Sequence, residues 1–279
     1  MKFTTLAVIA ALSLASTNGT RADETKKIVN AALNQLMINK DVSAVDKYFA
    51  EPYVQHNQSV PDGVEGLRGL ASQAIANNPA FGYKLVRLFT DGDTGIAHGV
   101  YEGFGKTPMV AFDIFRVENN KIVEHWDNLE PIAANNPSGH SQIDGPVLIK
   151  DLKKTQANKK LVAEFVEKVL IGGAFDTMPT YFDGDHYTQH NSNIGDGLTG
   201  LNEGLQALAK AGVNMRIEKV RMVYGRGNFV LAVSEGNINQ QATAFYDLFR
   251  VENNKIAEHW DVISSILPTE QAVNSNGKF

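Results

Sequence analysis

The stretch FRVENNKIVEHWD at residues 115–127 returns as FRVENNKIAEHWD at residues 249–261, with twelve of the thirteen residues identical. The two copies lie 134 residues apart, and the same spacing aligns YVQHN at 53–57 with YTQHN at 187–191. A third pair joins DGVEGL at 62–67 to DGLTGL at 196–201. Solenoid repeats are much shorter, at roughly 20 to 50 residues. The spacing therefore indicates two copies of a whole domain.

Each copy has helical spacing first and strand-like runs afterwards. Apolar residues at i, i+3 and i+4 predict a first helix over 28–36 and again over 162–170. A short second helix is expected at 45–49 and at 178–182, and a third at 67–75 and 201–209. Strand-like runs follow at 83–89, 94–101, 109–117 and 121–129, with equivalents in the second copy. Glu-Asn-Asn-Lys between the last two predicts a hairpin turn, because Asn tolerates positive φ.

This order of elements predicts an α+β fold, with helices packed on one face of a curved antiparallel sheet. We expect domain 1 at residues 23–133 and domain 2 at residues 151–268. The segment 134–150, with Asn-Asn-Pro-Ser-Gly and Asp-Gly-Pro, is expected to link them, and residues 269–279 to form a tail.

The first 22 residues have the layout of a cleaved signal peptide. Lys2 precedes an apolar run from Leu6 to Leu14, and small residues follow at Ala15 and Ala22. The run is too short for a membrane-spanning helix. The pattern predicts a secreted or periplasmic protein, and the alternative is a buried N-terminal helix.

Composition narrows the possible functions. The chain has 279 residues, 43% of them hydrophobic and 20% charged, as in soluble globular proteins. A net charge of −5 without a basic stripe argues against nucleic-acid and membrane partners. The chain contains no cysteine, which excludes disulfides, thiolate catalysis and cysteine-bound metal.

As a set, the motifs YxQHN, DGxxGL and DxFRVENNKIxEHWD resemble the SnoaL-like polyketide cyclase family of the nuclear-transport-factor-like superfamily, in both copies. The resemblance implies a cone-shaped α+β barrel whose open end holds an apolar pocket. It also implies an intramolecular aldol condensation without metal or cofactor. The family's acid/base aspartate matches Asp113 and Asp247, and a family histidine matches His98. Single-domain relatives commonly dimerise sheet against sheet, so the two copies are expected to form an internal pseudo-dimer.

The proposed chemistry needs a base in an apolar setting. Apolar burial raises the pKa of a carboxyl group and removes competing water. Strand alternation places Asp113 and Phe115 on one face, and His125 and Asp127 together on one face of the next strand. His98 would polarise a carbonyl or shuttle a proton.

The candidate catalytic residues are therefore Asp113, His98, His56 and His125, with Asp247, His190 and His259 in the second copy. The candidate substrate-binding residues are Asn57, Phe115, Trp126 and Asp127, with Asn191, Trp260 and Asp261 in the second copy. No metal or other cofactor is expected, since the histidines lack the close spacing of metal sites. A two-histidine, one-carboxylate site from His56, His98, His125 and Asp127 is the metal alternative.

Two readings stay open for these residues. Buried His, Asp and Asn networks that support a fold look the same in sequence as catalytic ones. His98 has no equivalent in Val-Leu-Ala-Val at 230–233, so either the second copy is a structural partner or the histidine is not essential. We expect an exported, cofactor-free acid/base enzyme of the aldol-cyclase or isomerase type, acting on a small apolar carbonyl compound. The alternatives are a non-catalytic binding protein and a dimerisation scaffold.

Overall fold

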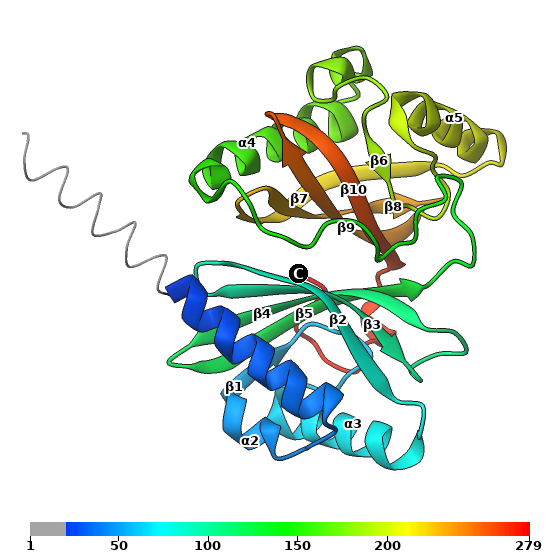
Figure 1. Ribbon diagram of the computed structural model, residues 1–279. Coiled ribbons are helices and arrows are strands. Elements are labelled where there is room, and N and C mark those ends of the chain that lie inside the picture. The colour runs from blue at the N-terminus through cyan, green and yellow to red at the C-terminus, as the bar shows by residue number, and fades with distance from the viewer. Residues whose placement is uncertain (1–20) are drawn as a thin grey trace, which may run out of the picture.

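The computed structural model describes residues 21–279, which form two α+β domains that each contain a five-stranded sheet (Figure 1). The α+β class and the tandem arrangement predicted from the repeat are confirmed. Residues 1–20, which hold almost all of the predicted signal peptide, lie outside the described part. Within residues 21–279, no helix combines the length and apolar character needed to cross a membrane.

Domain 1 begins with a helix over residues 21–33. It continues with η1 (Asn34–Ile38), α2 (Ala44–Tyr48), β1 (Phe49–Gln55), α3 (Gly63–Asn77), β2 (Gly82–Asp91), β3 (Thr94–Glu102), β4 (Met109–Glu118) and β5 (Lys121–Pro131). Of the apolar face predicted from the spacing, Ala32 and Leu36 are buried and Ile28 and Ala31 are half-buried. Val29 and Leu33, which were not predicted, complete the buried face.

Domain 2 repeats this order. It contains η2 (Leu152–Lys154), α4 (Thr155–Phe165), η3 (Val166–Ile171), η4 (Phe175–Thr180), β6 (Thr188–Gln189), α5 (Gly197–Lys210), β7 (Met215–Arg226), β8 (Phe229–Ile238), β9 (Gln241–Glu252), β10 (Lys255–Ser265) and η5 (Thr269–Gln271). The expected short second helix is a 3-10 helix here, η4, which contains Pro179.

The strand orders are β1-β5-β4-β3-β2 and β6-β10-β9-β8-β7. Four strands of each sheet are antiparallel, and the fifth, β1 or β6, runs parallel to the last strand of its domain. These parallel edge strands were not predicted. The Asn-Asn turns have the expected left-handed backbone, with φ of 50° and 62° at Asn119 and Asn120.

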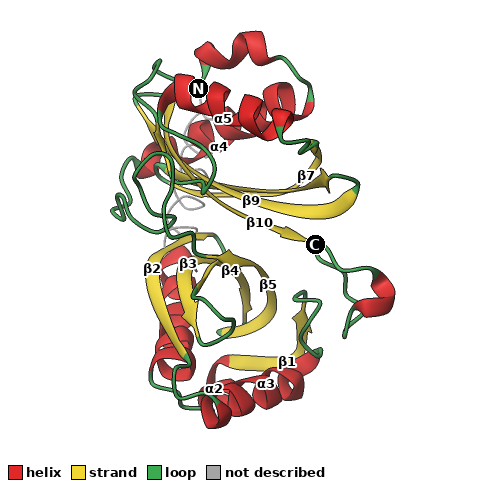
Figure 2. Ribbon diagram, turned by 90° about the vertical axis from the view of Figure 1, so that its right-hand side faces the viewer, coloured by secondary structure: helices red, strands yellow, loops and turns green. Residues whose placement is uncertain are grey.

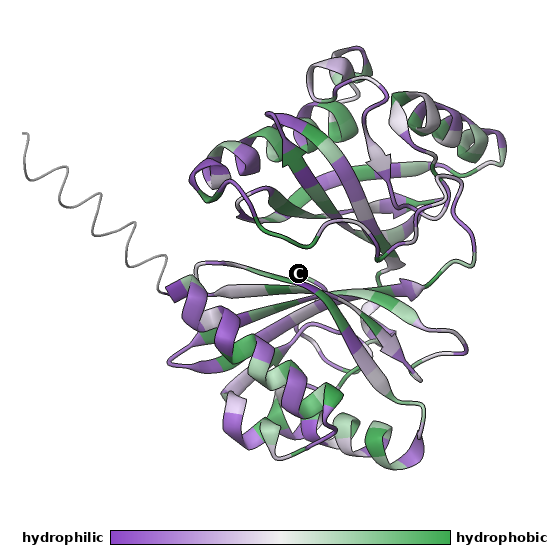
Figure 3. Ribbon diagram, viewed as in Figure 1, coloured by the Kyte–Doolittle hydropathy of each residue, from purple (hydrophilic) through white to green (hydrophobic). Residues whose placement is uncertain are grey.

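Each sheet has an inner face covered by the helices of its own domain (Figure 2). The strands contain both hydrophobic and hydrophilic residues (Figure 3), and β3 and β4 are buried along most of their length. On the inner face of sheet 1, Ala97, Ala111 and Phe115 share one apolar cluster with Val29 and Leu33 of the first helix. The face of the sheet that carries a side chain therefore decides whether that side chain can reach the interior of its own domain.

The outer faces of the two sheets pack against each other. One apolar cluster contains Phe112 and Ile114 of β4 together with Leu231 and other residues of sheet 2. Asn128 of β5 donates a hydrogen bond from Nδ2 to the carbonyl oxygen of Val262 on β10, at 2.7 Å. The two domains thus share a continuous apolar core.

In each domain, the segment that follows the last strand crosses to the other domain. The linker, residues 134–150, accepts a hydrogen bond from His190 Nδ1 at the carbonyl oxygen of Ser141, at 2.7 Å. The tail, residues 269–279, accepts one from His56 Nδ1 at the carbonyl oxygen of Gly277, at 3.1 Å. The two histidines come from the repeated YxQHN motif, so each motif holds the segment that leaves the opposite domain.

Candidate functional site

In domain 1, five of the predicted residues meet at the inner face. Asp113 on β4 lies opposite Asp127 on β5, and Phe115 lies opposite His125. His125 Nε2 lies 3.4 Å from Asp113 Oδ1. Asn57, in the loop after β1, donates from Nδ2 to Asp127 Oδ2 at 2.7 Å.

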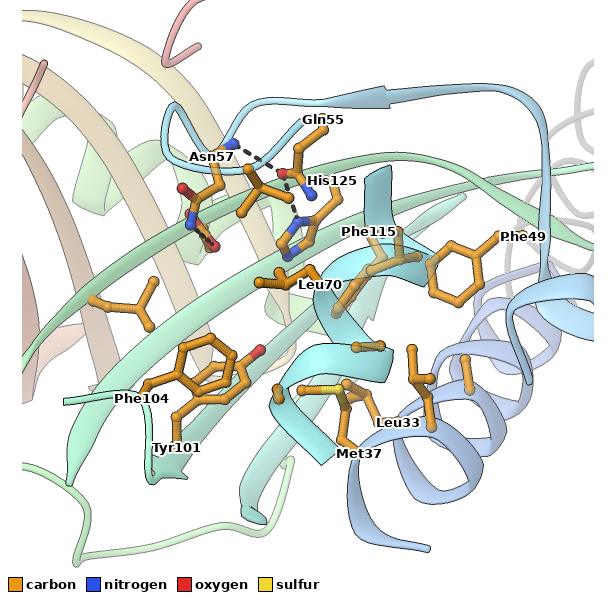
Figure 4. A pocket seen from close by; sticks show the side chains of 18 of the residues that line it. Leu33, Met37, Phe49, Gln55, Asn57, Leu70, Tyr101, Phe104, Phe115 and His125 are labelled. Atoms are coloured by element: carbon orange, nitrogen blue, oxygen red, sulfur yellow. Dashed lines mark hydrogen bonds between the residues drawn. The ribbon is translucent and has the colours of Figure 1, made fainter. Parts of the chain in front are cut away.

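Gln55 fixes the tautomer of His125. The backbone N–H of Asn57 donates to Gln55 Oε1 at 2.8 Å, so the oxygen end of this amide is the acceptor. His125 Nδ1 lies 3.0 Å from the same oxygen and must carry the proton (Figure 4). Because a carboxylate oxygen is also an acceptor, the contact between Nε2 and Asp113 requires a second proton between them.

Two tyrosines donate hydrogen bonds to Asp113. Tyr101 donates to Oδ1 at 2.8 Å, and Tyr83 donates to Oδ2 at 3.1 Å. Asp113 is fully buried. The adjacent cavity measures about 110 Å³ and has a mainly apolar lining, which includes Tyr101, His125 and Asp127. Both oxygens of Asp113 are thus already hydrogen-bonded to the protein.

Domain 2 has the same chain of hydrogen bonds from glutamine through histidine to aspartate, here called the relay, formed by its own residues. The backbone N–H groups of His190 and Asn191 donate to Gln189 Oε1 at 2.9 and 3.0 Å. His259 places Nδ1 at 2.9 Å from this oxygen and Nε2 at 3.1 Å from Asp247 Oδ1. Asn191 Nδ2 donates to Asp261 Oδ2 at 2.5 Å.

The tyrosine pair is missing from domain 2. Tyr101 pairs with Tyr83 across β3 and β2, whereas Gly236 pairs with Ile217 at the equivalent place in β8 and β7. Asp247 Oδ2 is buried and has no hydrogen-bond partner within residues 21–279, unlike Asp113 Oδ2. Asp261 Oδ1 and its equivalent Asp127 Oδ1 also lack a partner within these residues, so they do not distinguish the two domains. The cavity beside them measures about 280 Å³, well over twice the volume of the one in domain 1.

The charges in domain 2 favour a protonated His259. Burial by itself lowers the pKa of His259, but the hydrogen bond to Asp247 and the negative charges of Asp261 and Asp247 raise it above the ordinary value of 6.5. Burial raises the pKa of Asp261 above its ordinary 3.8, and the charge of Asp247 adds to this, while that of His259 opposes it. The site therefore retains protons next to an apolar cavity.

The prediction that His98 acts beside Asp113 is wrong. His98 pairs with Phe112, and Asp113 pairs with Ala97, so the two side chains leave the sheet on opposite faces. On the outer face, the His98 ring stacks on Phe112 at 4.4 Å, and its Nδ1 lies 3.1 Å from Arg87 Nη1. Burial and then the charge of Arg87 hold the pKa of His98 well below its usual range.

The expected roles of His56, His190 and the two tryptophans in the pockets are also wrong. His56 stacks on Trp126 at 4.7 Å, and its Nε2 lies 2.9 Å from Glu124 Oε1. His190 stacks on Trp260 at 4.5 Å in the same way. Trp126 lies opposite Ile114 and therefore on the outer face. The repeat preserves these residues on the packing side of each sheet and not in a cavity.

Several functional candidates were missed from the sequence. Gln55 and Gln189 stand inside the repeated YxQHN motif, and that repetition could have identified them. Tyr83 and Tyr101 come from strands that differ between the copies, so no repeat signal marks them. Glu130 also lines the cavity of domain 2, although it belongs to β5 of domain 1.

The same clusters contain the residues that could hold a divalent metal. Asp113, His125 and Asp127 offer ligand atoms within 4.8 Å of one another, as do Asp247, His259 and Asp261. In each set the glutamine directs the histidine Nε2 toward the carboxylates, which also suits a metal ligand. The His–Asp hydrogen bonds occupy the same atoms, so a metal and the proton relay exclude each other.

Comparison with known proteins gives a family match over part of the chain. Residues 29–125 match the model of the SnoaL-like domain. No curated protein sequence matches at a significant level.

Similar solved structures include TsrD from Streptomyces laurentii, at 18% identity, covering 39% of this chain and 89% of the other, with a TM-score of 0.34. An NTF2-like protein from Mesorhizobium loti has 23% identity, covers 39% and 93%, and has a TM-score of 0.35. An LEH-like epoxide hydrolase from M. tuberculosis has 18% identity, covers 39% and 84%, and has a TM-score of 0.34. Residues 29–125 are similar to the SnoaL-like domain, and the second half of the chain repeats the elements and motifs of that segment.

Proposed function

We propose that domain 2 is a cofactor-free acid/base enzyme for a small apolar carbonyl compound, and that domain 1 is its structural partner. The observation that carries this proposal is the unpartnered Asp247 Oδ2 beside a cavity of about 280 Å³. To act as a base, a carboxylate needs an oxygen that accepts no hydrogen bond from the protein. In domain 1, Tyr83, Tyr101 and His125 occupy both oxygens of Asp113.

The relay supplies the charge that a base requires. Gln189 keeps a proton on Nδ1 of His259, so the proton shared with Asp247 makes the ring an imidazolium beside a carboxylate. The positive ring stabilises negative charge on Asp247. Asp261 and Asn191 line the same cavity and provide polar contacts for the substrate.

In the proposed reaction, Asp247 Oδ2 takes a proton from the carbon next to the substrate carbonyl. The C–H electron pair forms the carbon–carbon double bond, and the carbonyl π pair moves to oxygen, which gives an enolate. Return of a proton to carbon completes an exchange or isomerisation. In an aldol closure, the enolate carbon attacks a second carbonyl carbon, the π pair moves to its oxygen, and Asp247 returns the proton to that oxygen. General-base catalysis of this kind contributes roughly 10²- to 10⁴-fold.

Hydrogen–deuterium exchange of acetophenone tests the proposal without knowledge of the natural substrate. The methyl signal is followed by proton NMR in D₂O with the full-length protein. We expect Asp247→Asn to slow the protein-catalysed exchange at least about 100-fold, and the matched Asp113→Asn to change it less than about threefold. EDTA should leave the rate unchanged, and a loss restored by Mn²⁺ or Zn²⁺ would show a metal enzyme instead.

Export of the protein is part of the same proposal. The N-terminal pattern of Lys2, the apolar run from Leu6 to Leu14 and Ala22 supports it. Mass spectrometry of protein from the culture supernatant or periplasm should find a mature N-terminus near Asp23. An intact Met1 on all of the protein would contradict export by this signal.

A further inference from the structure

We propose that the cavity of domain 2 is a composite site, in which Glu130 of domain 1 contacts the carbonyl oxygen of the bound compound. This inference rests on the proposed function and names the group that recognises the ligand. Glu130 lines the cavity together with Asp247, His259 and Asp261. The cavity of domain 1 is lined by domain 1 alone.

The backbone and the linker hold Glu130 in this position. The backbone N–H of Ile263 on β10 donates to Glu130 Oε2 at 3.0 Å. Gln142 in the linker donates from Nε2 to Oε1, and its own Oε1 accepts the N–H of Ala133 at 2.8 Å, which fixes the amide orientation. Hydrogen bonds to both carboxyl oxygens therefore fix the orientation of the Glu130 side chain.

The second copy does not reproduce this arrangement. The residue equivalent to Glu130 is Ser264, whose hydroxyl donates to Asn128 Oδ1 in the interface between the sheets. A serine at this place cannot extend into the cavity of domain 1. Within residues 21–279, the larger of these two cavities thus receives a carboxyl group from the other domain, and the smaller one does not.

The chemistry of Glu130 suits a hydrogen-bond donor to a carbonyl. Burial and then the charge of Asp261 raise the pKa of Glu130 to about 8, against the lowering effect of its hydrogen bonds from Ile263 and Gln142. At neutral pH the carboxyl group is therefore protonated and can donate its O–H. The other titratable groups that line the cavity are Asp247, His259, Asp261 and Tyr187.

Binding of acetophenone with a ¹³C-labelled carbonyl tests the inference on the full-length protein. We expect the wild-type Kd to rise about tenfold between pH 6.5 and 9.5, as Glu130 ionises and loses its donor. Glu130→Gln keeps an N–H donor, so its Kd should stay within about threefold across this range. Glu130→Leu should weaken binding about tenfold at pH 6.5 and move the carbonyl ¹³C signal upfield.

Two sets of controls separate this inference from the proposed function. The exposed Glu102→Gln should behave as wild type. Leu208→Trp fills the cavity of domain 2 and should abolish binding, whereas the equivalent Ala74→Trp in domain 1 should not. Binding that Leu208→Trp abolishes but both Glu130 variants leave unchanged would overturn the composite site alone. Absence of binding, or binding that Leu208→Trp leaves intact, would overturn both proposals.

Discussion

At the scale of single residues, one repeated stretch serves two different faces. His125 and Asp127 point to the inner face, while the alternating residues Glu124 and Trp126 point to the outer one. Alternation along a strand could be read from the sequence and placed Asp113 with Phe115 correctly. The position of His98 relative to Asp113 depends on the register between β3 and β4, which the turn sets and local periodicity does not reveal.

The raised pKa of His259 predicts a pH-dependent contribution to stability. A histidine with a folded-state pKa above its unfolded value stabilises the protein fully below about pH 6.5, and this is lost as pH rises through the folded pKa. His259→Gln should therefore reduce the free energy of unfolding by about 1–3 kcal/mol more at pH 5.5 than at pH 9. Urea unfolding at both pH values measures this, with the exposed His186→Gln as control, and an equal loss at both would contradict it.

At the scale of elements, the long amphipathic strands were predictable and the parallel edge strands were not. The runs predicted at 83–89, 94–101, 109–117 and 121–129 all lie within β2 to β5. β6 has only two residues and β1 contains Pro52, so neither shows a clear local pattern. Both are stabilised by parallel pairing with the last strand of the domain, which is a non-local contact.

Tyr83 on β2 and Tyr101 on β3 contact Asp113 in domain 1, and β7 and β8 of domain 2 lack these tyrosines. Tyr101→Phe removes a donor from the buried Asp113, so it should lower the free energy of unfolding by about 1–3 kcal/mol. Tyr246→Phe is the matched change, because the buried Tyr246 hydroxyl has no partner in the described part of the chain. It should cost less than about 0.5 kcal/mol. Equal losses in urea unfolding would show that the hydrogen bond to Asp113 is not what stabilises domain 1.

At the scale of the whole molecule, the two copies hold each other through the linker and the tail. The sequence indicated both segments, but it could not show that each crosses to the opposite domain, because their contacts with His56 and His190 span 221 and 49 residues. Deleting residues 272–279 should expose Trp126 and leave Trp260 unchanged. In a Trp260→Phe background, the deletion should shift the fluorescence emission to longer wavelength, and an unchanged spectrum would contradict the proposed role of the tail.

Glu130 links the stability of the whole molecule to pH. Its folded-state pKa of about 8 lies above the ordinary 4.5, so the unfolded chain releases this proton first and stability falls as pH rises between these values. The loss is up to about 5 kcal/mol. Glu130→Gln should flatten this fall in urea unfolding between pH 5 and 8.5. A variant that keeps the full wild-type slope would show that Glu130 titrates as a surface carboxyl.

The central claim is that the two copies have diverged, so that domain 2 is catalytic and domain 1 is structural. The rate of α-hydrogen exchange of acetophenone in the paired variants Asp247→Asn and Asp113→Asn tests it most directly. The unpartnered oxygen of Asp247 predicts a loss of at least about 100-fold in the first variant and little change in the second. Loss of exchange in Asp113→Asn, with exchange retained in Asp247→Asn, would contradict it.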